Sequence, residues 1–223
     1  MGYPYEYGGS YRLRQWGPDG QPFLVPGRPF KGLWIDDDDR QWRYWAHVRG
    51  SKKRGERLLA GHRKMMARGL EAFAAGDYGR ARSAFVLAGS MNEYDPACRV
   101  HLAHSYFALG RYRMAVGALR QAFWLEPRIR ELPYDVRSDY GRPQDFATHL
   151  AALKQSVEAF PAEPDLPLLL AYVSYYTGQR AEAYPALLEA KRRSAKDGPN
   201  RRLISLFMEV CKPSPFLARK TDG

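Results

Sequence analysis

Apolar residues recur along the chain after residue 56 at the spacing of amphipathic helices. On both sides of Gly110 they occupy one or two positions in each helical turn and do not alternate with polar residues as in a strand. Before this glycine they are Val100, Leu102, Ala103, Tyr106 and Phe107, and after it they are Ala115, Val116, Ala118, Leu119, Ala122 and Phe123. The pattern predicts two helices joined by a tight turn at the glycine.

The same arrangement occurs three times. The interval from Gly76 to Gly110 is one period of the repeat, and the interval from Gly110 to Gly178 is twice as long. An alanine follows each glycine after five positions, and a large apolar residue follows after nine. The alanines are Ala81, Ala115 and Ala183, and the large residues are Phe85, Leu119 and Leu187. We expect the alanines to let paired helices approach closely, the large residues to fill the space between them, and neighbouring pairs to cover each other's apolar faces.

A further, less regular unit is expected where the period skips one copy. Pro127 and Pro161 are again one period apart and bound this unit. Its second helix is predicted at residues 145–159. Its first half, residues 130–143, is predicted to form only a short or distorted helix because it contains residues that oppose a full one. They are Pro133, Gly141 and Pro143. A capping helix is predicted at residues 199–211.

This repeat resembles the tetratricopeptide repeat (TPR) family. The best unit begins with residues 99–112 (RVHLAHSYFALGRY) and continues with Ala115, Leu119, Ala122 and Pro127. The family's early tryptophan is missing from every unit, and Leu102-Ala103 stands where the family usually has Leu-Gly. The resemblance covers about residues 62–197. It implies an all-α, right-handed solenoid of about four helical hairpins, the third of them degenerate.

The resemblance also implies binding of a peptide or protein segment. Arrays of this family bind such segments in a concave groove lined by the first helix of each pair. The corresponding positions here are Arg63, Met66, Leu70, Phe73, Val100, His104, Phe107, Leu168, Tyr172, Tyr175 and Tyr176, with Arg202 on the capping helix. An aromatic and aliphatic lining with a cationic rim suits an apolar peptide with acidic flanks. No clamp for a terminal carboxylate is expected, because Met66 and Leu70 stand where cochaperone-type members carry Lys and Asn.

An intramolecular alternative stays open for this groove. Met66, Leu70 and Phe73 could instead pack under the leader or under residues 34–48. That segment contains Trp34, Trp42 and Trp45, which are plausible fillers because exposed tryptophans are costly.

The chain divides by composition into three parts. Residues 1–55 are expected to form an irregular leader and a transition segment, residues 56–213 the repeat domain, and residues 214–223 a disordered tail. Half of the positions from Met1 to Gly32 hold Gly, Pro or Tyr, and no helical or strand period is sustained there. The acidic run Asp36–Asp39 is interpreted as a helix cap or solvated loop, because it lacks the alternate spacing and the glycine of a calcium loop.

A net charge of +11 adds one further interpretation. Such a surface attracts polyanions and acidic partners. The first alternative is therefore a basic protein associated with nucleic acid. The second alternative is a self-associating structural module, because a short array leaves apolar ends. The basic residues of the first alternative are Ser51–Arg54, Arg111, Arg113, Arg120 and Lys191–Arg193. No apolar run approaches the length that a membrane span requires.

The chain carries no sequence motif of a catalytic or cofactor site, so a non-catalytic scaffold or adaptor without cofactor is expected. HExxH, GxSxG, P-loop and GxGxxG patterns are absent. Cys98, His101 and His104 look like metal ligands, but His104 lies about 120° around the helix from Cys98, so no metal site is predicted. Cys211 is the one other cysteine, which excludes a disulfide scaffold. No secretory signal is visible, and a cytoplasmic location is slightly favoured, although the sequence leaves the compartment unknown.

Overall fold

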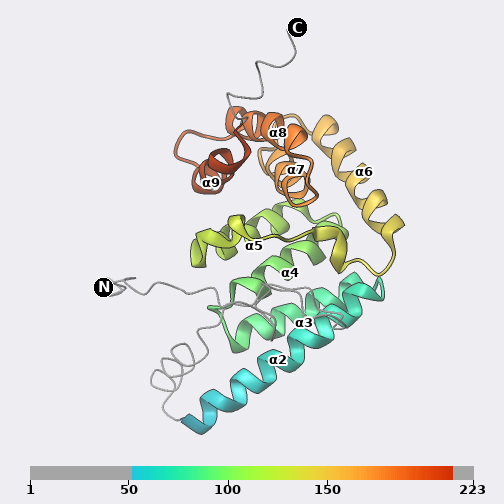
Figure 1. The fold of residues 1–223 in the computed structure, drawn as a ribbon, viewed down its shortest axis with the longest axis vertical. Coiled ribbons are helices and arrows are strands. Elements are labelled where there is room, and N and C mark those ends of the chain that lie inside the picture. The colour runs from blue at the N-terminus through green and yellow to red at the C-terminus, as the bar shows by residue number, and fades with distance from the viewer. Residues whose placement is uncertain (1–51, 213–223) are drawn as a thin grey trace, which may run out of the picture.

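The computed structural model describes residues 52–212, and the regular structure of this part is entirely helical (Figure 1). The α-helices are α2 (Lys52–Ala74), α3 (Tyr78–Met91), α4 (Pro96–Ala108), α5 (Tyr112–Leu125), α6 (Pro143–Ala159), α7 (Asp165–Tyr176), α8 (Arg180–Arg193) and α9 (Arg201–Cys211). Two short 3₁₀ helices, η1 (Pro127–Glu131) and η2 (Val136–Asp139), lie between α5 and α6. The predicted all-α class is therefore confirmed. The predictions for the leader, the acidic run Asp36–Asp39, the tryptophan fillers and the tail beyond residue 213 fall outside the described residues.

Three helix pairs share one type of turn, in which α2 packs on α3, α4 on α5, and α7 on α8. Gly76, Gly110 and Gly178 lie in these turns with φ of 84°, 68° and 78°. In each turn, the amide after the glycine donates a hydrogen bond to a carbonyl five residues earlier, as in a Schellman motif. These bonds are Asp77 N to Ala72 O at 2.9 Å, Arg111 N to Tyr106 O at 2.8 Å, and Gln179 N to Ser174 O at 2.8 Å. Glycine suits the positive φ because a Cβ would be strained there.

The small and large residues of the repeat meet inside these pairs. The three alanines and three large residues that follow the glycines have no exposed surface. They are Ala81, Phe85, Ala115, Leu119, Ala183 and Leu187. Gly69 of α2 faces the ring of Phe85 so closely that a Cβ would lie 2.5 Å from it. Close approach of the helices therefore depends on small residues on both sides of the pair.

No α-helix forms between α5 and α6, where the sequence predicts the first half of the less regular unit. Residues 127–142 form the two 3₁₀ helices and extended links, and α6 follows as the second helix of the unit (Figure 1). Proline limits helix formation here, since Pro133 lies two residues after the end of η1 and the residue before it, Leu132, is extended (ψ 137°). Pro143 instead occupies the first turn of α6, where its missing N–H costs nothing. The predicted distortion of residues 130–143 is present as this pair of short helices.

α9 corresponds to the predicted capping helix. α9 occupies Arg201–Cys211 and packs on α8, close to the predicted range. α2 starts at Lys52 and therefore includes the last residues assigned to the transition segment. Among residues 52–212, no helix has both the length and the apolar character needed to cross a membrane.

Candidate functional site

Most of the side chains predicted to line an open groove are buried. Nine of the twelve are at most 8% exposed: Met66, Leu70, Phe73, Val100, His104, Phe107, Leu168, Tyr172 and Tyr176. Tyr175 is partly buried, and Arg63 and Arg202 are exposed. The expectation of an open groove at the nine buried positions therefore needs correction.

The segment 127–142 covers much of this surface. Tyr175 and Tyr176 of α7 donate hydrogen bonds from Oη to the backbone carbonyls of Arg130 and Ile129, at 2.6 Å and 2.8 Å. The Tyr134 ring stacks on His104 of α4, with centroids 5.8 Å apart.

The C-terminal end of residues 127–142 reaches α2. The Tyr140 ring packs edge-on against Phe73 of α2, with centroids 4.9 Å apart. Next to it, a Cβ on Gly141 would lie 2.1 Å from the carbonyl oxygen of Ala74, so only glycine fits this approach. Residues 127–142 thus occupy the faces of α2, α4 and α7 that the sequence assigned to a peptide.

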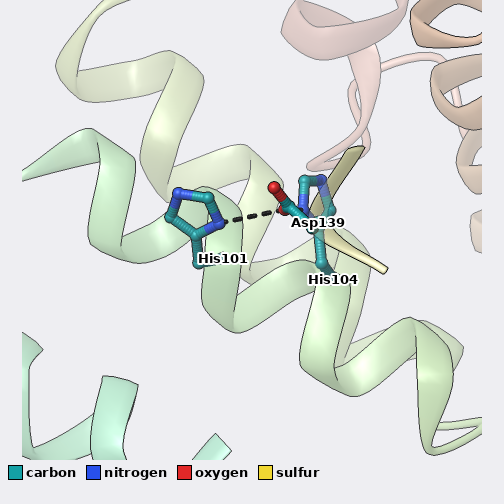
Figure 2. A group of neighbouring side chains, drawn as sticks. All are labelled: His101, His104 and Asp139. Atoms are coloured by element: carbon teal, nitrogen blue, oxygen red, sulfur yellow. Dashed lines mark hydrogen bonds and ion pairs between the residues drawn. The ribbon is translucent and has the colours of Figure 1, made fainter. Parts of the chain in front are cut away.

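A buried cluster of polar side chains joins this segment to α4 (Figure 2). His101 and His104 come from successive turns of α4, and the carboxylate of Asp139 approaches them from η2. His101 Nδ1 lies 3.2 Å and His104 Nδ1 2.9 Å from the same oxygen, Asp139 Oδ2. Tyr134 Oη donates to that oxygen as well, and His104 Nε2 lies 2.8 Å from Tyr172 Oη.

Burial and charge act in opposite directions in this cluster. The two histidines are each 2% exposed and Asp139 is 8% exposed. Burial alone would raise the pKa of Asp139, but the charges and hydrogen bonds of His101 and His104 outweigh it and the pKa is lowered. Burial lowers the pKa of His104 despite the neighbouring carboxylate. Asp139 is therefore ionised at neutral pH and His104 favours the neutral form.

Cys98 is not part of this cluster. Its thiol donates to the carbonyl oxygen of Phe85 at 3.2 Å, and burial raises its pKa. Cys98 stays apart from His104, as their spacing on the helix predicts, whereas Asp139, which no local spacing indicates, brings a third ligand-type atom to the histidines. One atom from each of His101, His104 and Asp139 lies within 4.8 Å of the others.

An open pocket of about 530 Å³ lies between α5 and α9 and extends to the start of α4. Its walls combine three arginines with a glutamate and several apolar side chains. The lining residues are Glu93, Arg99, Gly117, Arg120, Gln121, Phe123, Trp124, Leu125, Pro199, Arg202, Leu203 and Leu206. Of the predicted groove residues, this pocket includes only Arg202.

The three arginines are held differently. Arg120 is anchored in the wall, because its Nη1 donates to Asn200 Oδ1 at 2.7 Å and lies 3.8 Å from Asp165 Oδ1. Arg99 and Arg202 take part in none of the ion pairs formed within residues 52–212. Trp124 is 57% exposed, which is unusual for so large an apolar side chain. The pocket therefore offers cationic groups next to apolar surface.

The sequence did contain a signal for this pocket. On α5, the lining positions 117, 120, 121 and 124 follow the spacing i, i+3, i+4, i+7 of a single helix face. Positions 199, 202, 203 and 206 follow the same spacing at α9. Each face contains both arginine and apolar residues, whereas a helix face that packs in a core is almost entirely apolar.

Comparison of the chain with protein-family models and with curated proteins found no match.

Proposed function

We propose that this chain is a non-catalytic protein-interaction module, built as a right-handed TPR-like array, which binds an acidic protein segment in the pocket between α5 and α9. The repeat architecture is supported by the three equivalent turns at Gly76, Gly110 and Gly178, which follow one another at one and then two repeat periods. The degenerate unit accounts for the copy that the period skips.

The pocket is the observation that carries the proposal. The first-helix faces used by the family for peptides are covered by residues 127–142, whereas the pocket is open. Its volume lies in the range of about 300–1,000 Å³ that is typical of ligand sites. A side chain or two of a partner segment would fit inside it.

The chemistry of the lining selects the partner. Three arginines against one glutamate favour a carboxylate-bearing segment, and a guanidinium can bind a carboxylate through two parallel hydrogen bonds. Trp124 and the leucines of α9 favour an apolar side chain next to the acidic one. The proposed ligand is therefore a segment in which Asp or Glu flanks a Leu, Phe or Trp.

A peptide selection tests this proposal. The full chain is used to select binders from a phage-displayed peptide library, and the affinity of a selected, fluorescein-labelled peptide is measured by anisotropy. We expect enrichment of acidic and apolar residues. Trp124→Ala should weaken binding by about 30-fold, which is the 2 kcal/mol of a binding hot spot, and Arg202→Glu should weaken it by at least about tenfold, by removing one charge and opposing the ligand with another.

Arg201→Glu is the matched control. Arg201 is the neighbouring residue on α9, is exposed, and pairs with Asp197 at 2.8 Å, but it does not line the pocket. Equal losses for Arg201→Glu and Arg202→Glu would show that only net charge matters and would reject the pocket. Selected peptides without acidic residues would contradict the assigned ligand class.

The two alternatives from the sequence have distinct outcomes in the same experiments. Binding of a single-stranded oligonucleotide that falls steeply with salt and is lost in Arg202→Glu would favour the nucleic-acid interpretation. A mass that grows with concentration in light scattering, without peptide binding, would favour self-association.

A further inference from the structure

We propose that His101, His104 and Asp139 form a buried binding site for a divalent transition-metal ion, with Zn²⁺ as the best-fitting ion. The site is separate from the pocket between α5 and α9 and does not depend on the proposed peptide binding. It lies where the degenerate third unit meets α4 (Figure 2).

The spacing of the atoms supports this assignment. Imidazole nitrogen and carboxylate oxygen are common ligands of Zn²⁺, which binds them at about 2.0–2.2 Å in tetrahedral geometry. Two ligand atoms in such a site are then about 3.3–3.6 Å apart. Asp139 Oδ2 lies 3.2 Å from His101 Nδ1 and 2.9 Å from His104 Nδ1, so the ion requires only small side-chain shifts. Tyr134 Oη donates a hydrogen bond to the same oxygen.

The hydrogen bonding around Asp139 also favours a cation. Without one, three potential donors crowd Oδ2, namely both imidazole Nδ1 atoms and the Tyr134 hydroxyl, although a carboxylate oxygen offers about two lone-pair directions. With a cation between them, each imidazole presents a lone pair from Nδ1. The excess of donors at Oδ2 then disappears.

A supporting group is already in place behind His104. Metal-binding histidines usually donate their second ring N–H to an oxygen, which fixes the tautomer and the ring orientation. His104 Nε2 lies 2.8 Å from Tyr172 Oη, and both side chains are buried. When Nδ1 binds the metal, Nε2 carries the proton and donates it to this hydroxyl oxygen.

Charge compensation gives a fourth reason. A carboxylate this deeply buried needs a positive partner, because an uncompensated buried charge is costly. A divalent cation bound by Asp139 and the two imidazoles supplies that charge.

Metal content and Co²⁺ spectroscopy of the full chain test the proposal. Because the cluster is closed to solvent, the metal is supplied while the protein refolds from urea, and unbound metal is then removed. We expect one equivalent of Zn²⁺ by elemental analysis, and visible absorption bands of tetrahedral Co²⁺ when Co²⁺ replaces it. A refolded chain with no bound Zn²⁺ and no Co²⁺ bands would overturn the proposal without any variant.

Three substitutions locate the ion. Asp139→Asn keeps the shape of the side chain but removes its charge and should abolish the bound equivalent. Tyr172→Phe removes only the hydroxyl behind His104 and should weaken Zn²⁺ binding by about 10- to 100-fold, a loss that simple packing would not produce. This variant also serves if Asp139→Asn fails to fold. His149→Gln is the control, since this partly buried histidine of α6 contacts Tyr140 Oη at 3.2 Å outside the cluster.

The outcomes are distinguishable. Unchanged binding in His149→Gln, together with losses in the other two variants, supports the site. Equal Zn²⁺ binding in all variants would place the metal elsewhere in the chain and reject it. NMR could also show that His101 is protonated and that its signals do not change when the chain is refolded with Zn²⁺. That result would assign the compensating charge to the imidazolium and would reject the metal site.

Discussion

Replacing Gly110 by alanine should destabilise the protein through the backbone alone. The residue has φ of 68°, which L-residues other than Asn and Asp rarely adopt. An added Cβ would meet no atom within 4 Å, so steric conflict with neighbours contributes nothing. The left-handed conformation costs an alanine about 1–2 kcal/mol, and the free energy of unfolding should fall by that amount.

Gly117 provides a matched substitution with the opposite sign. It lies inside α5 without a positive φ, and its added Cβ would be 3.8 Å from Arg120 Nη2, an ordinary contact. Alanine is a better helix former than glycine by about 0.5–1 kcal/mol, so Gly117→Ala should stabilise the protein. The two variants should therefore differ in unfolding free energy by about 1.5–3 kcal/mol.

Urea unfolding followed by circular dichroism measures both values. For a chain of this size, each kcal/mol also moves the melting temperature by about 2–4 °C, which gives an independent check. Gly110→Asn should recover part of the loss because asparagine tolerates positive φ. A neutral Gly110→Ala variant, or a Gly117→Ala variant that loses as much stability, would refute the reasoning from turn geometry.

Three further predictions concern the helices and their core. Burial lowers the pKa of His62, but the hydrogen bond and charge of Asp95, 2.8 Å away, outweigh it and the net pKa is raised. The stability that this pair contributes is therefore complete below the unfolded pKa of His62, near 6.5, and is lost as pH rises through the higher folded pKa. His62→Gln should flatten that part of a plot of unfolding free energy against pH. An unchanged plot would contradict the assignment. Gly69→Ala should cost about 1–3 kcal/mol in urea unfolding because its Cβ would lie 2.5 Å from the Phe85 ring, and a neutral result would mean that the helices separate freely. Leu119→Ala should cost about 2–5 kcal/mol in the same assay, since this side chain has no exposed surface, and a loss below about 1 kcal/mol would contradict its place in the core.

Local patterns in the sequence were sufficient to predict the helical pairs. The glycine turns depend on interactions within one helix pair, and so do the alanines and large apolar residues that follow them. A repeated sequence pattern is therefore enough to predict them. Pro133 and Gly141 likewise disturb the backbone near their own positions, and the distortion of the third unit was predictable for that reason.

The site residues depended on contacts that the period does not encode. Asp139 lies 35 residues from His104 in the chain, and no local spacing connects them. Tyr134 and Tyr140 were not assigned a role because the resemblance provided groove positions only for regular first helices. No regular α-helix forms between α5 and α6, so the apolar faces of α4 and α7 have no helix to pack against there. Residues 127–142 cover these faces instead.

The approach of Tyr140 and Gly141 to α2 has a consequence for how this protein unfolds. In a simple repeat array each unit touches only its neighbours, so units at one end can melt while the rest stays folded. Here Tyr140 and Gly141, which precede α6, pack on Phe73 and Ala74 of α2, although α3 to α5 lie between them in the chain. The helices from α2 to α6 are thereby joined into a closed set of contacts, so they should melt in a single cooperative transition.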